Sequence, residues 1–195
     1  MERNESGRRS FLKRTAATAT GFVAVGSTAV PTAAASETYL DVQAHSGELD
    51  YYFSVTGSIE SRSYPGTESE DYIGDGYAYG TVTNDEDDED GYVITGDVTY
   101  VRLDGAGELY CYYGLDGTRR DTMEATTISG YSADYTLDAD DSGFTKTSDC
   151  ESNDSGGNLA DGTVSDGGSD TWKKSGNLTL VQTSNTSDYL QVYHE

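Results

Sequence analysis

Short segments in which apolar and polar residues alternate recur along this 195-residue chain, and this period of two restricts its fold most. Alternate residues of an extended strand lie on the same face. Clusters of Gly, Asp, Asn and Ser separate the segments, and a helical repeat of apolar residues is nearly absent. The pattern predicts an all-β protein with an antiparallel, β-sandwich-like fold. One predicted core face consists of Leu49, Tyr51, Phe53 and Val55.

The chain contains two similar stretches about eighty residues apart. Gly80–Thr83 followed by Gly91–Leu103 resembles Gly162–Ser165 followed by Thr171–Thr183. A duplication predicts two similar β halves, residues 36–118 and 119–195, packed as one unit. Alternatively, hairpins rich in Gly, Thr, Val and Asp resemble one another by composition alone. Two glycines interrupt long predicted strands in the two copies, where we expect bulges or bends; these are Gly96 and Gly176.

The first 35 residues have the layout of a twin-arginine export signal. A weakly apolar run and a small-residue stretch, residues 31–35, follow the charged motif. The apolar run, residues 15–30, is shorter than the roughly 20 residues that a membrane span needs. We therefore expect a secreted, extracellular protein with no stable membrane insertion after processing, although a retained anchor is the alternative. The motif residues are Arg8, Arg9, Phe11, Leu12 and Lys13.

Acidic residues greatly outnumber basic residues. After position 35 the chain has 33 acidic and 7 basic residues, a net charge of −26. Such a charge destabilises a compact state by self-repulsion unless concentrated salt screens it. The composition therefore predicts a halophilic protein, and an acidic reservoir for cations is the alternative. Nucleic acids and anionic membrane surfaces are unsuitable partners on electrostatic grounds.

Three segments of the first half resemble a module that recurs in secreted proteins of halophilic archaea. In that pattern an aromatic strand ends in a serine-glycine turn, and two Gly-containing strands follow. The segments here are Leu49–Glu60, Asp75–Thr83 and Gly91–Thr99. The resemblance covers roughly residues 38 to 114 and implies an extracellular β module of uncharacterised function, with no catalytic residues. The sequence around Trp172 departs from the pattern, so the second half matches it only loosely.

An acidic turn, residues 85–91, is the best candidate metal site in the sequence. Alternating acids before a glycine approximate the spacing of a calcium loop, and Asp97 falls at the twelfth place. The end residues and the strand that follows depart from such loops, so a solvated hairpin tip is the alternative. Apart from this weak calcium site, whose ligands are Glu86, Asp88, Asp90 and Asp97, no cofactor is expected.

Sixteen tyrosines and one tryptophan make up most of the aromatic residues. They suit the core of a chain that is poor in Leu and Ile, because tyrosine combines a large apolar area with a polar tip. Alternatively, an exposed set stacks against sugars as in carbohydrate-binding modules. The candidate sugar-binding residues are Tyr110, Tyr112 and Trp172.

Two cysteines, Cys111 and Cys150, lie in a chain expected to reach an oxidising exterior. We predict a disulfide that joins the last strand of the first half to a loop of the second. Two independent thiols are the alternative, because a bridge requires Cα atoms within about 7 Å.

The sequence lacks the motifs of common enzymes and transition-metal sites. Neither histidine has the spacing of a zinc site, and no nucleophile elbow or phosphate loop occurs. Paired carboxylates, as in glycosidases, do not indicate an active site here, because acidic residues are so frequent that two of them often lie close by chance. We therefore expect a non-catalytic extracellular structural or adhesion module with an unknown protein or glycan partner. The alternative is a carbohydrate-binding module, which a row of exposed aromatic side chains would favour.

Overall fold

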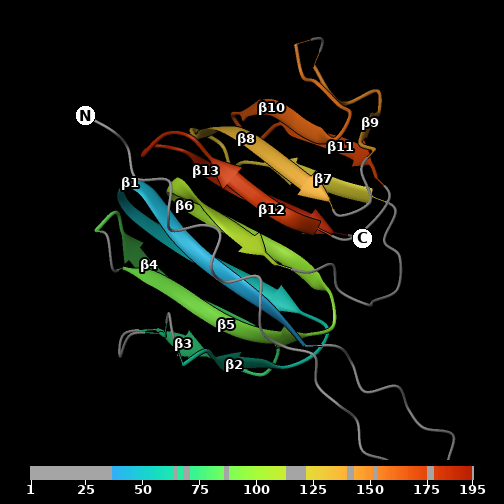
Figure 1. Cartoon of the computed structure of the whole chain (residues 1–195). Coiled ribbons are helices and arrows are strands. Elements are labelled where there is room, and N and C mark those ends of the chain that lie inside the picture. Colours follow the sequence, from blue (N-terminus) through green and yellow to red (C-terminus); the bar gives the residue numbers. More distant parts are fainter. Residues whose placement is uncertain are drawn as a thin grey trace, which may run out of the picture. The chain divides into compact units, whose positions relative to one another are not determined.

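Antiparallel strands dominate the part of the chain that the computed structural model describes, which comprises residues 37–63, 66–67, 71–85, 88–112, 122–139, 143–151, 153–174 and 178–194. No helix occurs within these residues (Figure 1), and none therefore has the length and apolar character needed to span a membrane. The strands are β1 (Glu37–Val55), β2 (Ile59–Ser61), β3 (Tyr72–Ile73), β4 (Tyr77–Thr83), β5 (Glu89–Thr95), β6 (Val98–Cys111), β7 (Thr122–Thr126), β8 (Ser132–Ala139), β9 (Thr145–Lys146), β10 (Leu159–Ser165), β11 (Ser169–Lys173), β12 (Leu178–Thr183) and β13 (Tyr189–His194).

All of these strands belong to one hydrogen-bonded sheet that is not closed into a barrel. The two longest strands hold it together, because each has different neighbours along its length. The first part of β1 pairs with β5 and its last part with β4, while β6 pairs with β1 throughout. On its other side, β6 pairs with β13 near its start and with β12 near its end. The all-β, antiparallel class is confirmed; the sandwich packing stays a prediction.

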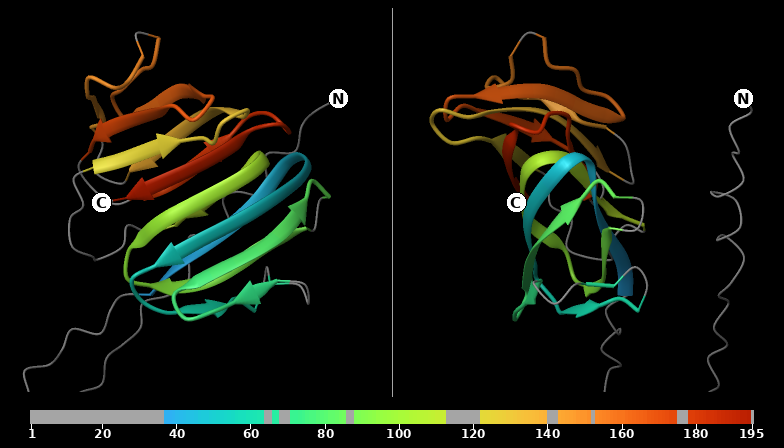
Figure 2. Two further views of the ribbon diagram at one scale, coloured as in Figure 1. Left: turned by 180° about the vertical axis from the view of Figure 1, so that it is seen from behind. Right: turned by 90° about the vertical axis from the view of Figure 1, so that its left-hand side faces the viewer.

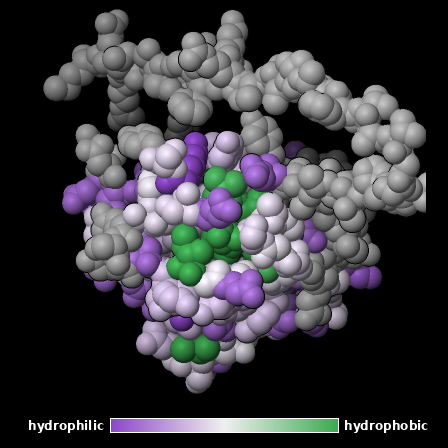
Figure 3. Space-filling model, turned by 90° about the horizontal axis from the view of Figure 1, so that it is seen from below, coloured by the Kyte–Doolittle hydropathy of each residue, from purple (hydrophilic) through white to green (hydrophobic). Residues whose placement is uncertain are grey.

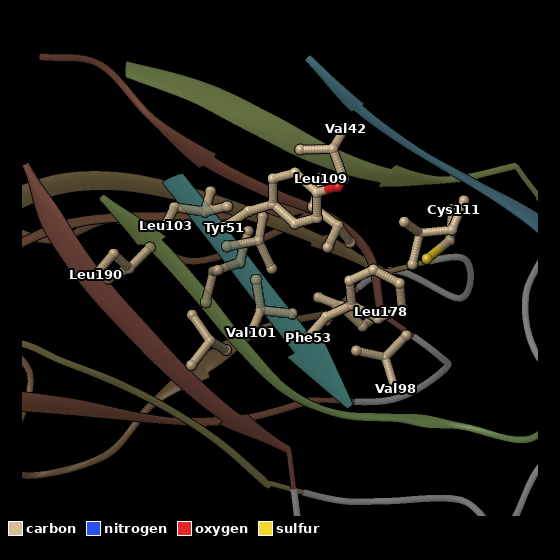
Figure 4. Packing of buried hydrophobic residues seen from close by; sticks show 14 of the residues in the cluster. Val42, Tyr51, Phe53, Val98, Val101, Leu103, Leu109, Cys111, Leu178 and Leu190 are labelled. Atoms are coloured by element: carbon tan, nitrogen blue, oxygen red, sulfur yellow. The ribbon is translucent and has the colours of Figure 1, made fainter. Parts of the chain in front are cut away.

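The core forms where the inward faces of these strands meet (Figure 4). The predicted face of β1 is confirmed, since Leu49, Tyr51 and Phe53 are fully buried and Val55 nearly so. On β6, Val101, Leu103 and Leu109 are also fully buried. Apolar burial on this scale, at roughly 25 cal/mol per Å², is the main force that holds such a sheet together.

The expected bulge or bend at Gly96 is a bend, and it separates two strands. Gly96 has a φ of 75°, in the left-handed region that glycine enters without steric strain. The chain leaves β5, which pairs with the first part of β1, and enters β6, which begins beside the last part of β1. The prediction of one strand across this glycine was therefore wrong. Gly176 and the export motif, Arg8, Arg9, Phe11, Leu12 and Lys13, lie outside the described residues.

The two halves use the same strand pairings. β1 and β4 place Tyr51 opposite Gly80, and β8 and β10 place Tyr135 opposite Gly162. In the first half, β5 pairs with the first part of β1. The matching pair in the second half is β11 with β7. Figure 2 shows the two groups of strands side by side, with β6 and β13 between them. Duplication stays a prediction, but these matched registers allow each position in one half to be compared with its equivalent in the other.

Candidate functional site

The described residues of the predicted calcium loop do not come together in the structure. Asp88 accepts hydrogen bonds from the backbone N–H of Thr83 (2.7 Å) and from its hydroxyl (2.5 Å). Asp90 is buried on β5, whereas Asp97 follows the other end of this strand. From Asp90 to the end of β5 at Thr95 the chain is extended over five residue steps, or about 17 Å. Asp97 lies beyond that end, so it cannot share an ion with Asp90. Glu86 lies outside the described residues.

The predicted disulfide is also wrong, because Cys111 and Cys150 are both free. Cys111 is fully buried on β6 and its side chain is part of the core (Figure 4). Cys150 lies in the loop after β9, where its thiol donates a hydrogen bond to the backbone carbonyl of Thr171 on β11 (3.2 Å). β13 and β7 separate β6 from β11 in the sheet. The sequence did not reveal this separation.

Of the three predicted sugar-binding residues, Trp172 is fully buried and cannot contact a ligand at the surface. Its indole N–H donates to the Tyr135 hydroxyl (2.9 Å). Tyr110 and Tyr112 are exposed and touch each other edge to face, with ring centroids 5.0 Å apart. These two tyrosines therefore remain available at the surface, but the expected platform with Trp172 does not exist.

Arg62 is held beside this tyrosine pair. Its guanidinium donates to both carboxylate oxygens of Asp41 (2.9 and 3.2 Å) and lies 4.6 Å from the Tyr39 ring centroid. The nearby carboxyl of Glu89 has its pKa raised to about 7, mainly by burial and next by the charge of Asp41. The contacts of Arg62 are thus satisfied within the protein, which indicates a structural role for this cluster.

A longer row of tyrosines crosses five neighbouring strands elsewhere on the sheet. Tyr72 and Tyr79 have ring centroids 5.2 Å apart and nearly parallel planes, and Tyr79 lies 6.5 Å from Tyr52. The row continues through Tyr100 to Tyr193, with centroid separations of 5.6 and 4.9 Å. We call this set the tyrosine row; it comprises Tyr72 on β3, Tyr77 and Tyr79 on β4, Tyr52 on β1, Tyr100 on β6 and Tyr193 on β13.

The tyrosine row is partly open to solvent. Tyr72 is 44% exposed, Tyr79 43% and Tyr193 40%, and the other members are intermediate. The sequence could not show which tyrosines form the row, because its members come from five strands. The only local indication was the spacing of Tyr77 and Tyr79, which places both side chains on one face of a strand.

The fold does not require aromatic residues at these positions. Tyr52 lies opposite Tyr79, and the equivalent positions in the second half hold Thr136 opposite Asp161. The Thr136 hydroxyl donates to Asp161 (2.7 Å), and a polar depression of about 300 Å³ opens there. The same backbone arrangement therefore supports either an aromatic or a polar surface.

No family model, curated protein or solved structure matches the chain. The function is therefore inferred from the side chains themselves, without support from relatives.

A buried polar cluster lies beneath each of these surfaces. In the first half the Tyr51 hydroxyl donates to Asp90 (2.7 Å) and also contacts the Tyr92 hydroxyl. In the second half the Tyr135 hydroxyl donates to Asp170 (2.7 Å) and accepts from Trp172. Burial is the largest cause of the raised pKa of both Tyr51 and Tyr135, so both phenols are neutral donors.

Each buried cluster contains a second aspartate. Asp71 forms a hydrogen bond with Asp90, whose pKa is raised to about 8, mainly by burial. In the second half, Asp154, Asp170 and Cys150 place one oxygen or sulfur atom each within 4.8 Å of the others. Among the described residues, this is the one group of three acidic, cysteine or histidine side chains that lie close enough together to hold a metal ion.

Proposed function

We propose that this chain is a non-catalytic extracellular module that binds a carbohydrate chain through the tyrosine row. The observation that carries the proposal is the row itself, six tyrosines that cross five strands with half of them exposed. An extracellular location is part of the proposal and depends on the export pattern of the first 35 residues. The resemblance to secreted halophilic modules supports the same setting.

The chemistry of the row suits a sugar ligand. Tyrosine offers an apolar ring for the C–H faces of a sugar and a hydroxyl for its polar groups. Five strands at about 4.8 Å spacing give the row a length of about 19 Å. This length accommodates several monosaccharide units, so the expected ligand is a polysaccharide rather than a single sugar.

The charge of the protein favours a neutral polysaccharide. The whole chain carries a net charge of −23, and an acidic glycan would be repelled wherever salt does not screen it. Figure 3 shows one face of the molecule, where hydrophilic side chains surround a small apolar patch. Such a surface disfavours broad hydrophobic association.

The second candidate is a purely structural or adhesion module, in which the tyrosines stabilise the sheet edge. It is favoured by the contacts of the rings with one another, since Tyr72 and Tyr79 pair across β3 and β4. β3 has only two residues, and such a short edge strand benefits from cross-strand aromatic contacts. The two candidates differ in whether a glycan binds.

Affinity electrophoresis in molar NaCl through gels that contain neutral polysaccharides tests the proposal. We expect the protein to be retarded, and Tyr79→Ala and Tyr72→Ala to weaken binding at least about tenfold each, or ~1.4 kcal/mol. Tyr131→Ala is the matched control, because Tyr131 is 48% exposed but contacts Tyr189 outside the row. Equal retardation of all variants contradicts binding through the tyrosine row. No retardation of the wild type contradicts glycan binding and leaves the structural role.

A further inference from the structure

The carboxylate of Asp154 is buried without a hydrogen-bond partner for either oxygen. Asp154 is only 5% exposed, and neither oxygen has a donor among the described residues. A buried charge without a partner is strongly destabilising. Lys146 is the cation near the cluster, since its charge lowers the pKa of Cys150 and of Asp170, but its ammonium donates to the Glu151 carbonyl (2.5 Å). Both Asp154 oxygens therefore remain without a donor among the described residues.

In the first half, two acids at the matching place are paired with each other by a hydrogen bond. Asp71 occupies the equivalent place there, since both it and Asp154 lie against a glycine opposite the buried tyrosine, Gly80 and Gly162 respectively. Asp71 forms a hydrogen bond with Asp90, whose raised pKa leaves it a proton to donate. Asp154 and Asp170 form no such bond.

The second half instead adds a thiol. Cys150 is four residues before Asp154, and a turn with a hydrogen bond from the Asp154 N–H to the Glu151 carbonyl brings the two side chains together. Asp170 reaches the same point from β11. We propose that Cys150, Asp154 and Asp170 form a binding site for a divalent cation of the zinc class.

The donor set selects the kind of metal. A thiolate favours zinc-like ions over calcium and magnesium, which prefer oxygen ligands alone. Zinc bonds to sulfur at about 2.3 Å and to carboxylate oxygen at about 2.0–2.2 Å. These bonds place tetrahedral ligand atoms roughly 3.3–3.7 Å apart. The observed spacing of up to 4.8 Å closes to this value with side-chain shifts of about 1 Å.

A second layer of hydrogen bonds already orients one ligand. The Tyr135 hydroxyl donates to an Asp170 oxygen (2.7 Å), and the Trp172 indole donates to Tyr135 (2.9 Å). Groups that hold a ligand in this way typically contribute 10–100-fold to metal affinity. Trp172 thus gains a role as support for the site, in place of the expected sugar contact.

Binding requires loss of the thiol proton. Burial is the largest cause of the raised pKa of Cys150, and the charges of Asp170 and Asp154 raise it further. A bound cation stabilises the thiolate, and the thiol proton leaves to solvent as the metal–sulfur bond forms. The hydrogen bond from the thiol to the Thr171 carbonyl is lost in this step.

Cobalt(II) and zinc(II) titrations of the full chain in molar NaCl with excess calcium test the site. High salt and calcium suppress weak binding to the many surface carboxylates. We expect one cobalt per chain with a thiolate-to-metal charge-transfer band in the near ultraviolet, and zinc should displace it. Absence of this band in the wild-type protein overturns the proposal.

Matched variants assign the ligands. Cys150→Ser should abolish the band, and Asp154→Asn should weaken zinc binding at least about tenfold, whereas Asp71→Asn should leave it unchanged. An unchanged zinc affinity in Cys150→Ser overturns the assignment.

Alkylation of the wild-type protein is a second readout that needs no variant. Zinc should slow the alkylation of Cys150, and a chelator should restore the alkylation rate. Cys111 should not react in either case, because it is fully buried and its pKa is raised to about 12. Alkylation that is indifferent to zinc also contradicts the site.

Discussion

At the scale of single residues, Asp90 is the least expected feature of the core. It lies in an acidic run, yet it is only 1% exposed and accepts a hydrogen bond from Tyr51. Burial disfavours the carboxylate and is the largest cause of its pKa of about 8. The hydrogen bond with Asp71 stabilises the protonated form further. The first half therefore contains a carboxyl that remains protonated near neutral pH.

This carboxyl makes the folded state bind more protons than the unfolded state. The pKa of Asp90 is raised from 3.8 to about 8 on folding. Its stabilising contribution is complete below about pH 4 and is lost as the pH rises through about 8. Asp90→Asn mimics the protonated form and should retain the hydrogen bonds. The substitution should therefore stabilise the protein more at pH 8.5 than at pH 5. We expect the difference in the free energy of unfolding, variant minus wild type, to be larger at pH 8.5 than at pH 5 by more than about 1.4 kcal/mol.

Urea unfolding at the two pH values measures this difference. Glu60→Gln is the control, since it removes the same charge from an exposed position on β2. A pH dependence of stability that is equal in Asp90→Asn and the wild type would falsify the assignment of a buried, protonated Asp90.

The alternation of Leu49, Tyr51 and Phe53 predicted their burial correctly, because neighbours in the sequence decide which face of a strand a side chain occupies. The burial of Asp90 could not be predicted in this way. It depends on the pairing of β5 with the first part of β1, which places Asp90 opposite Val42. The tyrosine row and the Cys150 cluster depend in the same manner on registers between distant strands.

At the scale of elements, β1 and β6 connect the whole sheet. The sequence did not reveal that residues 37–55 form the single strand β1, with shifts of register between Ala44 and Asp50. Conversely, it predicted one strand across Gly96, where the structure has two. Composition indicates where a chain bends, but only its pairing partners decide whether a bend interrupts a strand or ends it.

The position of Leu109 on β6 permits a test of cooperativity. This side chain is fully buried, and β6 pairs here with Val42 of the first half and Val181 of the second. Leu109→Ala should lower the free energy of unfolding by about 2–5 kcal/mol, because it leaves a cavity in the core. Both halves should unfold together in the variant.

Two probes distinguish the halves in this experiment. Fluorescence of the single tryptophan, Trp172, reports on the second half. Far-ultraviolet circular dichroism reports on all strands. Coincident urea transitions, both shifted to lower concentration, are expected for one cooperative unit. A tryptophan transition that stays in place while the dichroism shifts would show that the halves unfold independently.

At the scale of the whole molecule, the two halves combine one backbone arrangement with two different surfaces. The first half exposes tyrosines where the second exposes a threonine and an aspartate at the equivalent positions. Beneath them, the first half contains an aspartate pair and the second adds a cysteine. The tyrosine row lies mainly on the first half and the proposed metal site on the second, so each proposal is testable without the other.

The net charge of the whole chain leads to a prediction about salt. With 35 acidic and 12 basic residues, the folded protein concentrates negative charge that unfolding would disperse. The Debye length is about 3 Å at 1 M salt and about 14 Å at 50 mM. Dialysis from molar KCl to about 50 mM should therefore lower the melting temperature and weaken the near-ultraviolet dichroism of the buried Tyr51, Tyr92 and Trp172. Restoring the salt should recover the spectrum, which separates loss of screening from aggregation. A melting temperature that is the same at both salt concentrations would contradict adaptation to high salt, and the acid excess would then require another cause, such as cation storage.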